Sequence, residues 1–324
     1  MVPEGLMGSC YFITLAFKEN QHMKMTKSMA NILLLLASIL WGSGFVVTKI
    51  ALDANASPGF INFIRGFLFL ILVLMFFYEK IFRMTFKDFK IGFIAGLLNF
   101  GGYITQTIAV QYTTPSNNAF ITATYVVVVP FIAWGIYQKK LQLKSFISIF
   151  FCLLGMTILT GILNKALTIN IGDVYSFICA LFYAGAIVYL SYGVRTTDVS
   201  VVAFMLAVVQ AIGGLFFFLF LETGQLTDVN WSAAIMPLLY MGIICSFVGQ
   251  TVQVLSQKHT SATSAGLIMM LEGVFGSIFS VAFGFEEFTD KLVVGGMLIM
   301  FSIIIMEVDF EQMLAKNKKQ LRKQ

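Results

Sequence analysis

Charged side chains are scarce in this 324-residue chain, where Asp, Glu, Lys and Arg together make up 11% of all residues. An ordinary soluble domain has about 25%. Hydrophobic residues take up the difference and reach 58%. So little polar surface excludes a water-soluble fold, because the interior and most of the exterior must both be apolar. The composition predicts that lipid surrounds most of the side chains.

Histidine and cysteine are equally sparse, and their scarcity excludes several kinds of chemistry. The two histidines, His22 and His259, lie in a tail and in a link, so no His-based metal site or general base is expected within the membrane. The four cysteines are far apart and show no paired spacing, which argues against a disulfide framework. The chain also has no nucleotide-binding glycine loop. We therefore expect no metal, no cofactor and no nucleic-acid partner.

Long apolar runs fill the chain almost from end to end. A bilayer core of about 30 Å takes about 20 helical residues to cross. On that criterion the sequence predicts ten spans, at residues 30–50, 58–78, 89–111, 115–137, 144–163, 173–192, 200–221, 232–256, 262–283 and 290–307. The predicted fold is an all-α integral membrane protein with ten transmembrane helices. Residues 1–29 and 308–324 are expected to be cytoplasmic tails, the second of them basic.

The distribution of positive charge predicts the orientation of the spans. If the links alternate between the two sides, 17 Lys and Arg residues fall on the side of both termini and three on the other. Positive charge in short loops stays cytoplasmic. We therefore expect a multi-pass protein of the cell membrane with both termini in the cytoplasm. Frequent Ile, Lys, Phe and Asn are typical of an AT-rich bacterial genome, so we expect a bacterial source.

A weak internal repeat divides the predicted bundle into residues 30–163 and 173–307. With a shift of roughly 142 to 147 residues, Gln106-Thr107 falls near Gln250-Thr251, and residues 128–131 fall on residues 271–274. An odd number of spans in each half means that the halves enter the membrane from opposite faces. The sequence thus predicts two inverted five-helix repeats, an architecture common in transporters.

Four motifs, in order, resemble the EamA-type members of the drug/metabolite transporter superfamily. They are the run LWGSGFVVTK at 40–49, the pair Pro58 and Arg65, the stretch from Tyr112-Thr113-Thr114-Pro115-Ser116 to Pro130-Phe131, and the run 264–287 around Leu271-Glu272. The resemblance implies a ten-helix bundle in which the third, fourth, eighth and ninth helices surround a central cavity. The first, second, sixth and seventh helices would be its movable walls. Gly273 replaces a proline usual in the family, so a softer bend is expected in span nine than at Pro130 in span four.

Glu272 and Arg65 are the charged residues expected inside the membrane. Counting from the start of span nine at 1.5 Å per residue places Glu272 about 15 Å deep. A carboxylate there costs several kcal/mol unless it is protonated, paired or hydrated. Glu272 is thus either a proton-coupling or cation-binding group, or a structural carboxyl. Arg65, roughly 10 Å from the opposite interface, either snorkels to that interface or binds an anionic group or Glu272. Its position resembles that of an arginine recurrent in the family, which implies a structural or gating role.

Two neutral polar stripes lie at matching places of the repeat. Asn99, Tyr103 and Gln106 share one helix face in span three, as do Ser246, Gln250 and Gln253 in span eight. These stripes are expected to line a water-accessible cavity, or else to join helices by hydrogen bonds. The aromatic residues Trp41, Tyr103, Tyr125 and Tyr183 fall at mid-span, away from the interfacial positions usual for Trp and Tyr. They line the cavity or pack in the core.

These features favour a secondary transporter that moves a small metabolite or drug-like solute by alternating access, as a proton-coupled exporter. The alternatives are an uncoupled facilitator or exchanger of amino acids or nucleobases, and a non-transporting scaffold. A membrane enzyme is not expected, because no cluster of His, Asp, Ser or Cys converges near an interface. The expected partners are the solute and the lipid bilayer, and the protein is expected to be a monomer or a homodimer.

Overall fold

The computed structural model describes residues 25–138, 143–160, 170–222 and 226–307, and within these ranges it is entirely helical. The first half contains α2 (Lys27–Asp53), α3 (Pro58–Ile81), α4 (Phe86–Tyr112), α5 (Pro115–Ala123), α6 (Tyr125–Tyr137) and α7 (Leu143–Thr160). The second half contains α8 (Ile171–Gly193), α9 (Val199–Phe220), the 3-10 turn η1 (Leu226–Asp228), α10 (Trp231–Tyr240), η2 (Met241–Gln250), α11 (Thr251–Gln257), α12 (Ala262–Met269), α13 (Leu271–Ala282) and α14 (Asp290–Glu307).

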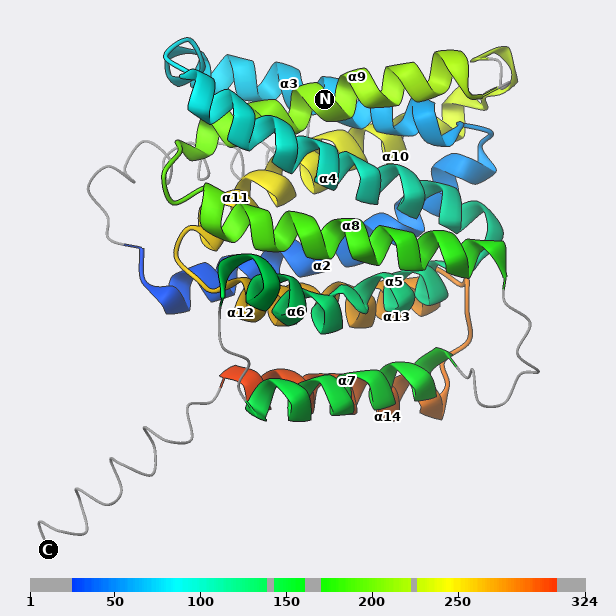
Figure 1. The fold of residues 1–324 in the computed structure, drawn as a ribbon. Helices are drawn as coiled ribbons and strands as arrows, with labels where there is room; N and C mark the ends of the chain where they lie inside the picture. The colour runs from blue at the N-terminus through cyan, green and yellow to red at the C-terminus, as the bar shows by residue number, and fades with distance from the viewer. Residues whose placement is uncertain (1–24, 139–142, 161–169, 223–225, 308–324) are drawn as a thin grey trace, which may run out of the picture.

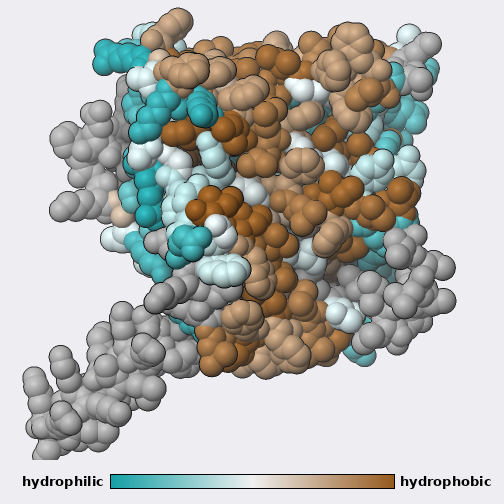
Figure 2. Space-filling model, in the orientation of Figure 1, coloured by the Kyte–Doolittle hydropathy of each residue, from teal (hydrophilic) through white to brown (hydrophobic). Residues whose placement is uncertain are grey.

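The helices run side by side in one bundle (Figure 1). In this view α3 and α9 form one side, α7 and α14 form a separate pair on the other, and α2 and α8 lie between them. The start of α2 and the end of α14 lie at the same end of the bundle. Brown apolar side chains cover the middle of the surface, and teal polar ones gather at the two ends of the helices (Figure 2). Such an apolar belt is what a bilayer requires.

Eight spans of the described chain are long and apolar enough to cross a membrane. They correspond to the predicted spans one to four and six to nine. In α7 and α14 the apolar stretches are shorter, at Leu143–Gly155 and Val293–Ser302. The prediction of an all-helical membrane protein is therefore confirmed. The number of ten membrane-spanning helices stays a prediction.

Side-chain caps and prolines set the helix starts. Thr85 accepts a hydrogen bond from the backbone N–H of Asp88, whose carboxylate accepts one from the N–H of Thr85, and this pair forms a capping box. Pro58 and Pro115 occupy the first positions of α3 and α5. A proline is tolerated there because its missing N–H would have no helical partner. The helices therefore begin where local chemistry favours it.

Spans four and nine are each broken near the middle, and the two breaks have nearly the same geometry. Thr124 separates α5 from α6 with φ −61° and ψ −11°, and Met270 separates α12 from α13 with φ −62° and ψ −14°. Pro130 lies inside α6, after the break. The interruption of span four therefore comes before Pro130, and the softer bend expected in span nine stays a prediction. The chain turns at equivalent places whether or not a proline follows.

Span eight contains a π-helix of ten residues, η2, between α10 and α11. Stretches of π-helix are rare, usually single-turn, and frequent at functional sites. Two bonds from α2 reach this segment: Trp41 Nε1 donates to the carbonyl of Cys245 at 2.9 Å, and Ser43 Oγ lies 2.7 Å from the Tyr240 hydroxyl at the junction. The segment is therefore held from the side by α2.

Glycine brings α3 and α9 into backbone contact. A Cβ at Gly66 would lie 2.3 Å from the nitrogen of Ala211, and a Cβ at Gly214 would lie 2.3 Å from the nitrogen of Phe63. No other residue fits at such distances, and small residues commonly allow this approach between membrane helices.

Candidate functional site

A small central cavity lies among α2, α3, α4, α6, α8, η2, α11, α12 and α13. Its volume is about 40 Å³. At roughly 10–15 Å³ for each water, the cavity has room for only a few waters. The predicted site residues that line it are Trp41, Arg65, Asn99, Tyr103, Gln106, Tyr125, Tyr183, Gln253 and Glu272.

Arg65 enters the cavity from α3 and is only 4% exposed. Its Nε donates to the hydroxyl of Ser246 at 3.2 Å, and its Cζ lies 4.2 Å from the centre of the Tyr103 ring. A guanidinium over an aromatic face gains a cation–π attraction, which is larger when water is excluded. The two terminal nitrogens make no hydrogen bond or ion pair with any residue in the described ranges.

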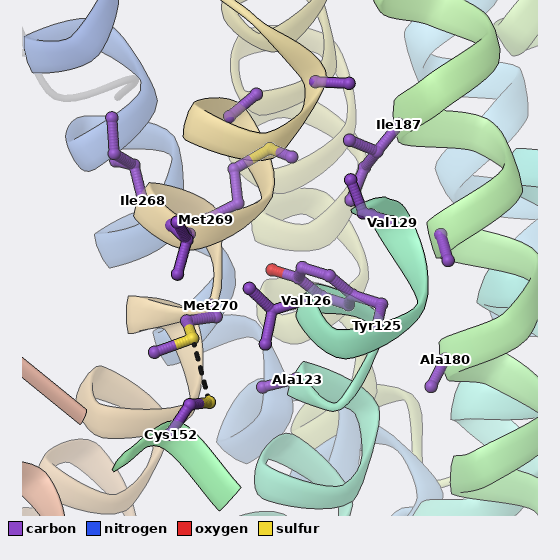
Figure 3. Close-up of a cluster of buried hydrophobic side chains, with 14 of the residues drawn as sticks. Ala123, Tyr125, Val126, Val129, Cys152, Ala180, Ile187, Ile268, Met269 and Met270 are labelled. Carbon is purple, nitrogen blue, oxygen red and sulfur yellow. Dashed lines mark hydrogen bonds between the residues drawn. The ribbon is translucent and has the colours of Figure 1, made fainter. Parts of the chain in front are cut away.

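Glu272 enters from the first turn of α13, directly after the break at Met270, and is also 4% exposed. Figure 3 shows Tyr125, at the head of α6, beside Met269 and Met270. The two broken spans therefore meet at this point. The Tyr125 hydroxyl lies near the carboxyl of Glu272, yet it forms no hydrogen bond of normal geometry with a described residue. No ion pair joins Glu272 to Arg65 in the described part of the chain.

Three tyrosines form a continuous aromatic wall. The Tyr183 ring packs edge-on against Tyr103, with centroids 5.6 Å apart, and against Tyr125, with centroids 6.5 Å apart. The Tyr183 hydroxyl donates to Oε1 of Gln106 at 3.3 Å. Edge-to-face pairs favour a fixed geometry. The wall joins α4, α6 and α8 around the cavity.

Ser246 and Gln250 do not line the cavity, although the sequence placed them in one stripe with Gln253. Ser246 instead accepts the hydrogen bond of Arg65, and Gln250 Nε2 donates to Oε1 of Gln210 on α9 at 3.1 Å. Both residues therefore join helices by hydrogen bonds, which was the second of the two roles expected from the sequence. The ten-residue π-helix alters the rotation per residue between 246 and 253, which a straight α-helical pattern does not anticipate.

Sequence reasoning missed several lining residues, most of them apolar: Gly44, Phe45, Thr48, Ala186, Ile187, Cys245 and Met269. Apolar residues at mid-span carry no signal that separates a cavity wall from ordinary packing. Thr48 is polar, and its position one turn beyond Gly44 on the same helix face was the available clue.

The bundle, its apolar belt and its central cavity are those of a multi-pass helical membrane protein. Sequence comparison makes the class specific. The model of the EamA-like transporter family matches residues 28–161 and again residues 170–308, so the chain belongs to this family. The family match identifies a transporter, as the motifs predicted.

Relatives and solved structures agree with this assignment. A protein of Archaeoglobus fulgidus named "Uncharacterized transporter" is 33% identical over 279 residues, which are 86% of each chain. The mouse "Solute carrier family 35 member F2" is 26% identical over 205 residues, 61% of this chain and 54% of the mouse protein. A crystal structure at 18% identity superposes with a TM-score of 0.68 over 86% of this chain and 96% of the other, which shows a shared fold.

Proposed function

We propose that the protein is a secondary transporter that moves a small organic solute by alternating access, with its two family repeats arranged as inverted five-helix halves. The double family match and the equivalent breaks at Thr124 and Met270 support this arrangement. Discontinuous spans that meet at a midplane site are typical of transporters built from inverted repeats. The solute site in this proposal is the cavity lined by Trp41, Asn99, Tyr103, Gln106, Tyr125, Tyr183 and Gln253, supported by Ser246 and Gln250.

The observation that carries proton coupling is the buried carboxyl of Glu272, which forms no ion pair in the described part of the chain. It is buried near the middle of a span, faces the cavity, and has no cationic partner among the described residues. A carboxylate in such a place needs a proton, water or a bound cation. Glu272 therefore supplies a site that exchanges a proton as the cavity becomes accessible to either side. Among the described residues, the ionisable side chains that interact with it electrostatically include Tyr103, Tyr125, Tyr183 and Cys179.

Uptake into proteoliposomes, with and without a pH gradient, tests this proposal. The wild type is expected to accumulate a solute from a pooled labelled set only when the gradient is present. Glu272→Gln keeps the shape of the side chain and removes the exchangeable proton, so it should abolish accumulation. Glu287→Gln makes the same change at an exposed acid outside the cavity and should leave accumulation unchanged.

Gradient-independent flux that is equal in wild type and Glu272→Gln would contradict proton coupling. The protein would then be an uncoupled facilitator or exchanger, with Glu272 as a structural carboxyl beside Tyr125. Absence of flux for every solute class, in protein that is folded and correctly inserted, would contradict the transporter proposal and favour a non-transporting scaffold.

A further inference from the structure

Helix α11 has a polar face that begins at the central cavity. Gln253, Ser256 and Gln257 lie at i, i+3 and i+4 and therefore share one side of this helix. All three side chains are buried, and Gln257 is 0% exposed. Gln253 lines the cavity, and Gln257 lies one helical turn beyond it, about 6 Å along the axis. The polar face therefore leads out of the cavity wall and along the helix.

The end of α11 lies beside the start of α2, at the end of the bundle that is predicted to be cytoplasmic. Thr260, in the link after α11, donates a hydrogen bond to Oδ1 of Asn31 on α2 at 3.1 Å. On the other side of α11, Leu255 packs in an apolar cluster with Val202 and Leu206 of α9. The helix is therefore two-sided although all of its residues are buried.

The polar face has hydrogen-bonding atoms that no described residue uses. They are Oε1 of Gln253, Oγ of Ser256, and both Oε1 and Nε2 of Gln257. An amide group offers two donor hydrogens and one acceptor oxygen. Burial of such atoms without partners is costly, and ordered water commonly supplies the missing bonds in native proteins. Adjacent groups of this kind, continuous with a cavity that has room for waters, indicate a row of waters.

Neighbouring helices add polar groups at the same end of the bundle. Ser191, near the end of α8, and Ser200, near the start of α9, are buried, and the hydroxyl of each has no partner in the described part of the chain. Their chain neighbours Leu190 and Val199 belong to the same apolar cluster as Leu255. Buried hydroxyls therefore occur on helices that pack around the end of α11.

The groups on this face suit water and protons better than an organic solute. Amides and hydroxyls order water through hydrogen bonds and do not themselves ionise near neutral pH. The segment from Gln253 to Gln257 has no charged residue. Because Gln257 is fully buried, an organic solute has no opening beside it in this conformation, whereas a single row of waters needs little space.

From this arrangement we infer that a file of water molecules follows α11 between the central cavity and the predicted cytoplasmic end, and that it conducts protons to and from Glu272. The proton role rests on the proposed proton-coupled transport, whereas the water file does not depend on it. Glu272 and Gln253 line the same cavity, so a proton that reaches Gln253 enters the site. The other ionisable residues that line this cavity are Arg65, Tyr103, Tyr125, Tyr183 and Cys245.

Cysteine labelling of the full-length protein tests the water file. Ser256→Cys, Gln257→Cys and Leu255→Cys are made in a cysteine-free background and treated with 2-aminoethyl methanethiosulfonate in inside-out vesicles that enclose a thiol scavenger. The reagent attacks the thiolate, which rarely forms in apolar surroundings, so the first two variants should react at least about tenfold faster than Leu255→Cys. Ser256→Cys is nearly isosteric and keeps the test valid if Gln257→Cys folds poorly.

Uptake into proteoliposomes tests the proton role. Gln257→Leu should slow accumulation driven by a pH gradient several-fold. Exchange of labelled for unlabelled solute at equal pH should keep its wild-type rate, because no net proton movement is needed. Gln111→Leu makes the same change at an exposed residue of α4 and should alter neither rate, and Gln257→Asn should restore part of the accumulation.

Reaction of Ser256→Cys and Gln257→Cys no faster than that of Leu255→Cys would overturn the water file. Fast reaction combined with unchanged accumulation in Gln257→Leu would overturn the proton role, and so would an equal loss of accumulation and exchange. Failure of the transporter proposal has a different signature, the absence of flux in wild type, and the labelling result does not depend on flux.

Discussion

Single residues set the contact between α3 and α9, where Gly66 faces the backbone of Ala211. An added methyl group has no room there, because the obstacle is backbone and not a flexible side chain. Gly66→Ala is expected to lower the free energy of unfolding by about 1–3 kcal/mol, the usual cost of overpacking. Thermal unfolding in detergent measures the effect.

Gly135→Ala is the matched control for that change. Gly135 lies on an exposed face of α6, with no atom within 4 Å of the added Cβ. Alanine favours helix more than glycine does, so this variant should be as stable as wild type or more so. Equal destabilisation of both variants would show that α3 and α9 are not as close as described.

The hydrogen bond between Gln250 and Gln210 provides a second prediction at this scale. Both side chains are buried, and each has one further polar atom without a partner in the described chain. Either Gln→Leu change leaves the other amide unpaired and should destabilise by about 1–3 kcal/mol, whereas the double variant loses both polar groups and should be less destabilised than the sum. A double-mutant cycle of unfolding free energies measures this coupling, and strict additivity would contradict it.

At the scale of elements, the π-helix η2 depends on a bond from α2. Trp41→Phe removes the donor to the Cys245 carbonyl and should speed amide hydrogen exchange in residues 241–250, because the backbone there loses its lateral support. Exchange in α3 and α9 should be unchanged. Trp134→Phe, at a 52% exposed tryptophan on α6, is the matched control and should have no effect on η2.

The sequence is sufficient to predict most helices and insufficient for their irregularities. Apolar length predicts the spans because the bilayer sets a fixed requirement. The break at Thr124 is invisible to that criterion, since both half-helices are apolar and the nearest proline, Pro130, lies beyond it. For the site, polar and aromatic residues at mid-span identify one wall of the cavity. Its apolar lining, such as Ile187, depends on packing between distant helices.

At the scale of the whole molecule, the orientation in the membrane is open to a direct test. Thr196 and Thr227 are exposed threonines in links at opposite ends of the bundle. The three cysteines of the described chain are buried, and a cysteine-free background removes the fourth as well. If the termini are cytoplasmic, an impermeant thiol reagent should label Thr227→Cys in intact cells and label Thr196→Cys only after permeabilisation. The reverse pattern would contradict the proposed topology.

The backbone contact at Gly66 has a mechanical consequence for the whole protein. Helix α3 belongs to the first family repeat and α9 to the second. Because their backbones touch, no layer of side chains lies between them on which they could slide. The two helices therefore pack as one unit, which contains one helix from each repeat. We therefore expect α3 and α9 to move together in the proposed alternating-access cycle, although they belong to different repeats, and spin labels on the two helices should keep a constant separation.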